Sequence, residues 1–141
     1  MPTYLFVYGT LRAAFSNASA IRLRQHSRYI GEGAINGRLY NIGSYPGALY
    51  LPNDPKLIYG SVYALFPDSL ADLLQSLDKY EGVQTVQSEN EPDEYIRRIV
   101  SVTCAGQPIS CWVYLYNWPV DSLHQIDSGD YVQYIMKQAD L

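Results

Sequence analysis

Glycine residues that interrupt the β-rich segments constrain the fold of this 141-residue chain more than any other feature. Residues 29–35 and 37–42 are predicted to form short strands, interrupted by Gly31, Gly33 and Gly37. Glycine within such segments is typical of the bulges and bends that curve a sheet into a barrel. Strands and helices do not alternate regularly, which argues against a doubly wound parallel sheet.

The remaining elements are predicted from local patterns. Runs of β-branched and aromatic residues predict strands at 3–8 and 57–66, and a long hairpin made of 95–104 and 109–116. The clearest helix opens at Pro67, carries Leu70, Leu73, Leu74 and Leu77 at helical spacing, and ends near Gly82. We also expect a helix with Asn17 as its N-cap and a final helix after Asp130. Loops or turns are expected at 43–47, 53–55 and, as a mobile acidic loop, 83–94.

These elements predict an α+β fold: a small, strongly bent mixed β-barrel with two or three flanking helices, forming a single domain over residues 1–141. With 48% hydrophobic and 17% charged residues, the chain is apolar enough to build a core. Its formal net charge is −4, and the ten Lys and Arg residues are scattered. This argues against nucleic acid as a partner, because backbone binding needs a basic stripe.

Location and cysteine chemistry follow from similar arguments. No run approaches the roughly 20 apolar residues of a membrane span, so no membrane partner is expected. The first residues lack the pattern of a signal peptide, and we therefore expect a cytoplasmic protein. Cys104 and Cys111 flank a predicted turn and could lie opposite one another on paired strands, as free thiols in a reducing compartment. Together with His26 and His124 they match no metal-binding spacing.

The first candidate for chemistry is the segment Tyr8-Gly9-Thr10-Leu11-Arg12, directly after the first predicted strand. Glycine permits a sharp turn there and leaves consecutive backbone N–H groups able to point at a ligand oxygen. Such a turn could hold a carboxylate, a phosphate or a developing oxyanion. The alternative is an ordinary turn with no ligand.

The second candidate is Glu81, at the C-terminal end of the leucine-rich helix. The helix dipole disfavours an anion there and should raise the pKa of Glu81, which would suit general acid–base catalysis. The alternative is a solvated glutamate at a helix end.

Aromatic residues and one arginine complete the candidates. The chain has 14 Tyr against 3 Phe, so its core must satisfy many hydroxyl groups or a pocket must be lined with phenols. Arg97 and Arg98 occupy opposite faces of one predicted strand, so at most one faces inward. An inward arginine would need a carboxylate partner.

Taken in order, these segments resemble the gamma-glutamylcyclotransferase-like family, which includes gamma-glutamylamine cyclotransferases and AIG2-like proteins. The resemblance covers nearly the whole chain. It rests on Leu5 to Arg12, Tyr45-Pro46-Gly47, Gly60 to Leu65, Leu77-Asp78-Lys79-Tyr80-Glu81-Gly82, Tyr95 to Arg98, Trp112 to Tyr116 and Ile126 to Tyr131.

The resemblance implies an enzyme that converts a γ-glutamyl amide to 5-oxoproline and a free amine, with no metal or organic cofactor. It implies a cavity floored by the Gly9 turn and Glu81 as the general acid–base residue. The expected substrate-binding residues are Tyr8, Gly9, Thr10, Leu11, Tyr45, Pro46, Tyr95 and Tyr116.

Two alternatives remain open. One is a non-catalytic small-molecule-binding or interaction module on the same fold. The other is an enzyme whose substrate is a γ-glutamylated biosynthetic intermediate. The four acidic residues of segment 83–94 would favour amine-bearing substrates over anionic ones if they line the mouth of the site. The sequence leaves the substrate and the oligomeric state open.

Overall fold

A computed structural model describes residues 3–12, 15–43, 45–81 and 94–139, without the side chains of residues 79–81 and 138–139. Its strands are β1 (Thr3–Val7), β2 (Ser27–Asn41), β3 (Pro46–Tyr50), β4 (Leu57–Leu65), β5 (Tyr95–Cys104), β6 (Gln107–Tyr116) and β7 (His124–Ile126). Its helices are α1 (Ala18–Gln25), α2 (Leu70–Glu81), which follows a 3-10 turn at Pro67–Ser69, and α3 (Tyr131–Ala139).

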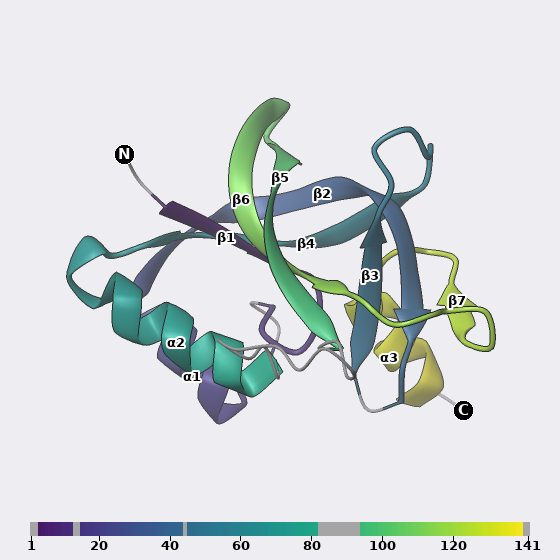
Figure 1. The fold of residues 1–141 in the computed structure, drawn as a ribbon, viewed down its shortest axis with the longest axis horizontal. Helices are drawn as coiled ribbons and strands as arrows, with labels where there is room; N and C mark the ends of the chain where they lie inside the picture. Colours follow the sequence, from purple (N-terminus) through teal and green to yellow (C-terminus); the bar gives the residue numbers. More distant parts are fainter. Residues whose placement is uncertain (1–2, 13–14, 44, 82–93, 140–141) are drawn as a thin grey trace, which may run out of the picture.

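Five of these strands close into a barrel in the order β2-β4-β1-β6-β5 (Figure 1). Closure comes from a short antiparallel pairing of β2 with β5, in which Gly33 lies opposite Cys104. The β1–β6 pairing is parallel and the other pairings are antiparallel, so the barrel is mixed, as predicted. The far end of β2 leaves the barrel and pairs with β3 on one side and β7 on the other.

Strand β1 of the barrel wall is buried on both faces, because its side chains alternate between the two core clusters. From β1, Phe6 joins the core cluster that includes Ile35, Ile58 and Val102. Its neighbours Leu5 and Val7 join a second cluster, which contains Leu23 of α1 and Leu73 and Leu77 of α2. Full burial of a leucine contributes about 1.5–3 kcal/mol, so the leucine face of α2 accounts for its position against the wall.

The helices form where the sequence predicted them. Asn17 caps α1 by accepting a 2.8 Å hydrogen bond from the N–H of Ala20. Helix α1 packs against α2, while α3 lies beside the β3–β2–β7 extension (Figure 1). There the Nδ2 group of Asn41 donates a 3.1 Å hydrogen bond to the Tyr134 hydroxyl. Among the described residues, none of these helices has the length and apolar character needed to cross a membrane.

Three local predictions are corrected by the tertiary structure. Segment 29–35 and residues 37–41 belong to one strand, β2, which pairs with β4 as far as Asn36, with a register shift between Tyr29 and Gly31, and with β3 from Gly37 onward. Glycine therefore bends this strand without ending it. Part of the predicted loop 43–47 is strand, because β3 begins at Pro46, a position where the missing N–H of proline is tolerated.

The cysteines are the third correction. Cys104 lies opposite Gln107 and Cys111 lies opposite Val100, so they do not face one another across the hairpin. Both are buried free thiols. Burial, with the charge of Cys104 as a smaller cause, raises the pKa of Cys111 to about 12, so this thiol stays protonated and packs as a small apolar group.

Candidate functional site

The turn after β1 is held tightly against the start of β3. The N–H of Arg12 donates a 3.1 Å hydrogen bond to the carbonyl of Gly9, which closes the turn. A β-carbon added to Gly9 would lie 2.8 Å from Cγ of Pro46, closer than real contacts allow. Only glycine fits at this position without moving its neighbours.

Three side chains of this turn, those of Tyr8, Leu11 and Arg12, are buried. The Tyr8 hydroxyl donates a 2.5 Å hydrogen bond to the carbonyl of Tyr114 and accepts one of 3.3 Å from the N–H of Ala48. Leu11 is 2% exposed and belongs to the core cluster that contains Leu73 and Leu77 of α2. The turn is thereby joined to β3, to β6 and to the helix that carries Glu81.

A row of aromatic rings lies beside this turn. Ring centroids are 6.0 Å apart for Tyr45 and Tyr95, 5.4 Å for Tyr95 and Tyr116, and 6.4 Å for Tyr116 and Trp118. The buried Tyr95 hydroxyl donates a 2.7 Å hydrogen bond to the carbonyl of Pro46. The structure thus brings Gly9, Pro46, Tyr95 and Tyr116 together, whereas Tyr45 and Trp118 lie at the two exposed ends of the row.

The Tyr45 end of the row also carries a carboxylate. The Tyr45 hydroxyl donates a 2.9 Å hydrogen bond to Oε1 of Glu94. Burial, followed by the charge of Glu94, raises the pKa of Tyr116, which therefore stays a neutral phenol at physiological pH. A β-carbon on Gly47 would lie 2.8 Å from the Tyr116 ring, so this strand position too is restricted to glycine.

Helix α2 is fixed to the barrel through Asp78, one turn before Glu81. Oδ1 of Asp78 accepts a 2.6 Å hydrogen bond from the Tyr114 hydroxyl and lies 3.2 Å from Nε of Arg97. The guanidinium of Arg97 lies 4.6 Å from the centre of the Trp112 ring. Arg98 is exposed and Arg97 is the more buried of the two, with a carboxylate partner, which agrees with the prediction that at most one of them faces inward.

The Glu81 side chain lies outside the described residues, as do Gly82 and segment 83–93. The raised pKa of Glu81, its acid–base role and the acidic mouth therefore stay predictions. The ligand contacts assigned to Tyr8, Gly9, Thr10, Leu11, Tyr45, Pro46, Tyr95 and Tyr116 also stay predictions. The structure places all eight of these residues in the turn after β1, at the start of β3, or on the neighbouring strands β5 and β6.

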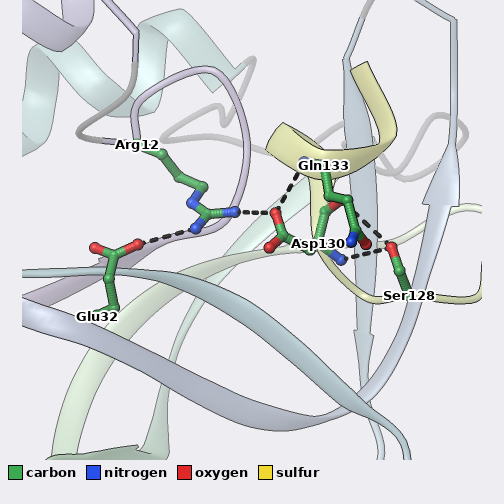
Figure 2. Close-up of polar contacts among 5 residues, drawn as sticks. All are labelled: Arg12, Glu32, Ser128, Asp130 and Gln133. Carbon is green, nitrogen blue, oxygen red and sulfur yellow. Dashed lines mark hydrogen bonds and ion pairs between the residues drawn. The ribbon is translucent and has the colours of Figure 1, made fainter. Parts of the chain in front are cut away.

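The sequence did not predict the contacts of Arg12. Figure 2 shows the Arg12 side chain between two carboxylates. Its Nη1 lies 2.8 Å from Oδ1 of Asp130, and its Nη2 lies 2.9 Å from Oε1 of Glu32. Arg12 and Asp130 both belong to segments that carry the family resemblance, and this was the one feature of the sequence that could have pointed to them. Their pairing was not predictable from the sequence because they are 118 positions apart.

In the described part of the chain, no three His, Cys, Asp or Glu side chains gather so that they could hold a metal ion.

The sequence of this chain is similar to those of one protein family. The model of the family described as "Gamma-glutamyl cyclotransferase, AIG2-like" matches residues 5–133. A putative gamma-glutamylcyclotransferase of Vibrio cholerae is 35% identical over 136 residues, covering 94% of this chain and 98% of the relative. The gamma-glutamylcyclotransferase family protein YtfP of Escherichia coli K12 is 31% identical over 129 residues, covering 91% and 95% of the two chains.

A solved structure supports the same assignment. The crystal structure of YkqA from Bacillus subtilis matches with a TM-score of 0.72 and 26% identity. The match covers all of this chain but only 44% of YkqA. The barrel fold and the resemblance predicted from the sequence are confirmed: the chain belongs to the gamma-glutamyl cyclotransferase, AIG2-like family.

Proposed function

We propose that this protein converts a γ-glutamyl amide to 5-oxoproline and a free amine. The observation that carries the proposal is the family match over residues 5–133. It is supported by the way Gly9, Pro46 and Tyr95 meet beside the helix that ends at Glu81. The substrate class is a small γ-glutamyl compound.

In the proposed reaction, the α-amine nitrogen of the substrate attacks its own γ-carbonyl carbon. A new C–N bond closes the five-membered ring, and the bond from the γ-carbon to the leaving amine breaks. Because the attack is intramolecular, the main task of the protein is to hold the folded-back conformer. Backbone N–H groups of the Gly9 turn would bind the α-carboxylate or the oxyanion.

Two protons must also move, because the α-ammonium nitrogen carries three hydrogens and the ring nitrogen of 5-oxoproline carries one. Ionised Glu81 would accept one proton before the attack and one from the ring nitrogen after it, and deliver each to the nitrogen of the leaving amine, which departs as an ammonium group, so that no net proton is consumed. A carboxylate at the C-terminal end of a helix is suited to this exchange, because the helix dipole disfavours its charged form.

The test is to incubate the purified protein with a panel of γ-glutamyl amino acids and γ-glutamyl amines and to measure 5-oxoproline by mass spectrometry. Glu81→Gln should lower turnover by roughly 10²- to 10⁴-fold, the usual contribution of a general acid–base group. Asp72→Asn is the matched control, because Asp72 is exposed on the same helix. We expect it to leave turnover unchanged.

Two results would contradict the proposal. Full activity of Glu81→Gln would remove the acid–base assignment. No turnover of any panel member, combined with tight binding of a small molecule, would favour a non-catalytic binding module.

A further inference from the structure

The turn that begins at Gly9 ends in an arginine held between two distant parts of the fold. The Arg12 side chain is 9% exposed. One of its nitrogen atoms pairs with Glu32 on strand β2, and another pairs with Asp130 at the start of helix α3 (Figure 2). The guanidinium thus spans from the barrel wall to the helix that follows β7.

Both carboxylates are themselves held in place. Oδ1 of Asp130 also accepts a 3.2 Å hydrogen bond from the N–H of Gln133, which makes Asp130 the N-cap of α3. Oε2 of Glu32 accepts a 2.7 Å hydrogen bond from the Tyr29 hydroxyl. Each carboxylate thus has a second partner besides Arg12, which restricts the positions that the guanidinium can take.

Stability alone is a weak reason for this arrangement. Removing an arginine from water costs several kcal/mol, and the Coulombic gain of a buried ion pair often does no more than offset that cost. In addition, the Nε atom of Arg12 is buried and has no hydrogen-bond partner among the described residues. The planar guanidinium of Arg12, with its two carboxylate partners, instead supplies a defined geometry at the end of the turn.

The other residues of the turn are held by separate elements. Gly9 packs on Pro46 of β3, and the carbonyl of Thr10 accepts a 2.6 Å hydrogen bond from Nδ2 of Asn17 at the start of α1. Leu11 is buried in the cluster that contains α2 leucines. Arg12 completes this set by fixing the end of the turn, where its own N–H donates the 3.1 Å hydrogen bond to the carbonyl of Gly9.

We infer that Arg12 is a positioning residue: its ion pairs with Glu32 and Asp130 hold the backbone N–H groups of Gly9, Thr10 and Leu11 in the orientation that binds the anionic part of the substrate. The inference rests on the proposed function for the identity of the ligand. The positioning itself is a property of the unliganded protein and is measurable without turnover. A preorganised donor costs no reorganisation when charge arrives, and misplacement by about 1 Å can cost on the order of 100-fold in rate.

The experiment compares Arg12→Gln, Arg12→Lys and Asp130→Asn with the wild type. Asp130→Asn keeps a good N-cap for α3 but removes the charge that faces Arg12, and Arg12→Lys keeps the charge but loses the two-pronged geometry. Arg38→Gln is the matched control, because Arg38 forms a 2.8 Å ion pair with Asp54 that involves no residue of the turn.

Two readouts are needed. Amide hydrogen exchange of the unliganded protein, corrected for intrinsic rates, should speed up by about tenfold or more at residue 12, whose N–H donates the hydrogen bond that closes the turn, in the Arg12 and Asp130 variants, while amides of the β5–β6 hairpin keep their wild-type rates. The kcat/KM for a γ-glutamyl substrate should fall by roughly 10- to 100-fold in Arg12→Gln. A rise in KM would assign the turn to the α-carboxylate, whereas a fall in kcat would assign it to the oxyanion.

The outcomes separate this inference from the proposed function. A wild-type exchange rate at residue 12 and wild-type kcat/KM in Arg12→Gln and Asp130→Asn would overturn the positioning role. Faster exchange throughout the protein would also overturn it, because that pattern is a general loss of stability. If the wild type turns over no γ-glutamyl compound but exchange changes locally as expected, the proposed function fails and the positioning role stands.

Discussion

The Tyr114 hydroxyl donates a 2.6 Å hydrogen bond to Asp78, which joins barrel strand β6 to helix α2 one turn before Glu81. The carbonyl of the same Tyr114 accepts the hydrogen bond from the hydroxyl of Tyr8, the residue that precedes Gly9. A single tyrosine on the barrel wall therefore links the helix of the proposed acid–base residue to the turn of the proposed anion-binding site.

Tyr114→Phe should accordingly weaken both stability and turnover. The substitution keeps the ring and removes one hydrogen bond to a charged group, which costs about 1.5–3 kcal/mol of the free energy of unfolding. Urea unfolding and 5-oxoproline release measure the two effects. Arg98→Gln, at an exposed position of the neighbouring strand, should leave both unchanged. Wild-type stability of Tyr114→Phe would contradict the role given to this contact.

Gly9→Ala should disturb the site through a steric clash with Pro46. The new methyl group would lie 2.8 Å from Cγ of Pro46, and overpacking of this kind typically costs about 1–3 kcal/mol. We expect a lower kcat/KM and a lower melting temperature. The double variant Gly9→Ala/Pro46→Ala removes the clashing ring and should recover part of the stability. An equal loss in the single and double variants would show that the clash is not the cause.

Tyr95→Phe should destabilise the protein more than Tyr45→Phe does. The Tyr95 hydroxyl is buried, and its loss leaves the carbonyl of Pro46 without this 2.7 Å hydrogen bond, at a cost of about 1–3 kcal/mol. The Tyr45 hydroxyl bonds to Glu94 at an exposed position, where water replaces it. Chemical denaturation of both variants checks the order, and equal effects would contradict it.

Glu32 should make stability depend on acidic pH. Burial by itself raises the pKa of this carboxyl group, but hydrogen bonds from Tyr29, Arg12 and Ser61 outweigh burial and lower the pKa below its ordinary value of 4.5. A lowered pKa in the folded state stabilises the protein above pH 4.5, and this contribution is lost as the pH falls through the folded value.

The test is to compare Glu32→Gln with the wild type by urea unfolding at neutral pH and near pH 3. The variant should be less stable at neutral pH, and the difference should shrink in acid, where the wild-type carboxyl group is protonated. A difference that stays constant across this range would show that the charge of Glu32 is not what stabilises the fold.

Local patterns predicted most of the elements because their causes act over a few residues. Leucines at helical spacing predicted α2, and Asn17 caps α1 as expected. Local patterns failed where the partner strand decides the conformation. Gly31 and Gly33 do not end β2 because β4 pairs with the strand on both sides of them, and the strand continues at Gly37 because β3 takes over the pairing there. Pro46 begins β3 because β2 lies alongside.

The sequence by itself determined the fold class, the family and the segments from which the candidate site is built. The tertiary structure alone decided how they are joined: Tyr114 to Asp78 over 36 positions, and Arg12 to Asp130 over 118. Such contacts depend on how the barrel closes and where its helices dock. No local preference of the chain encodes that geometry, because the residues become neighbours only when distant strands have paired.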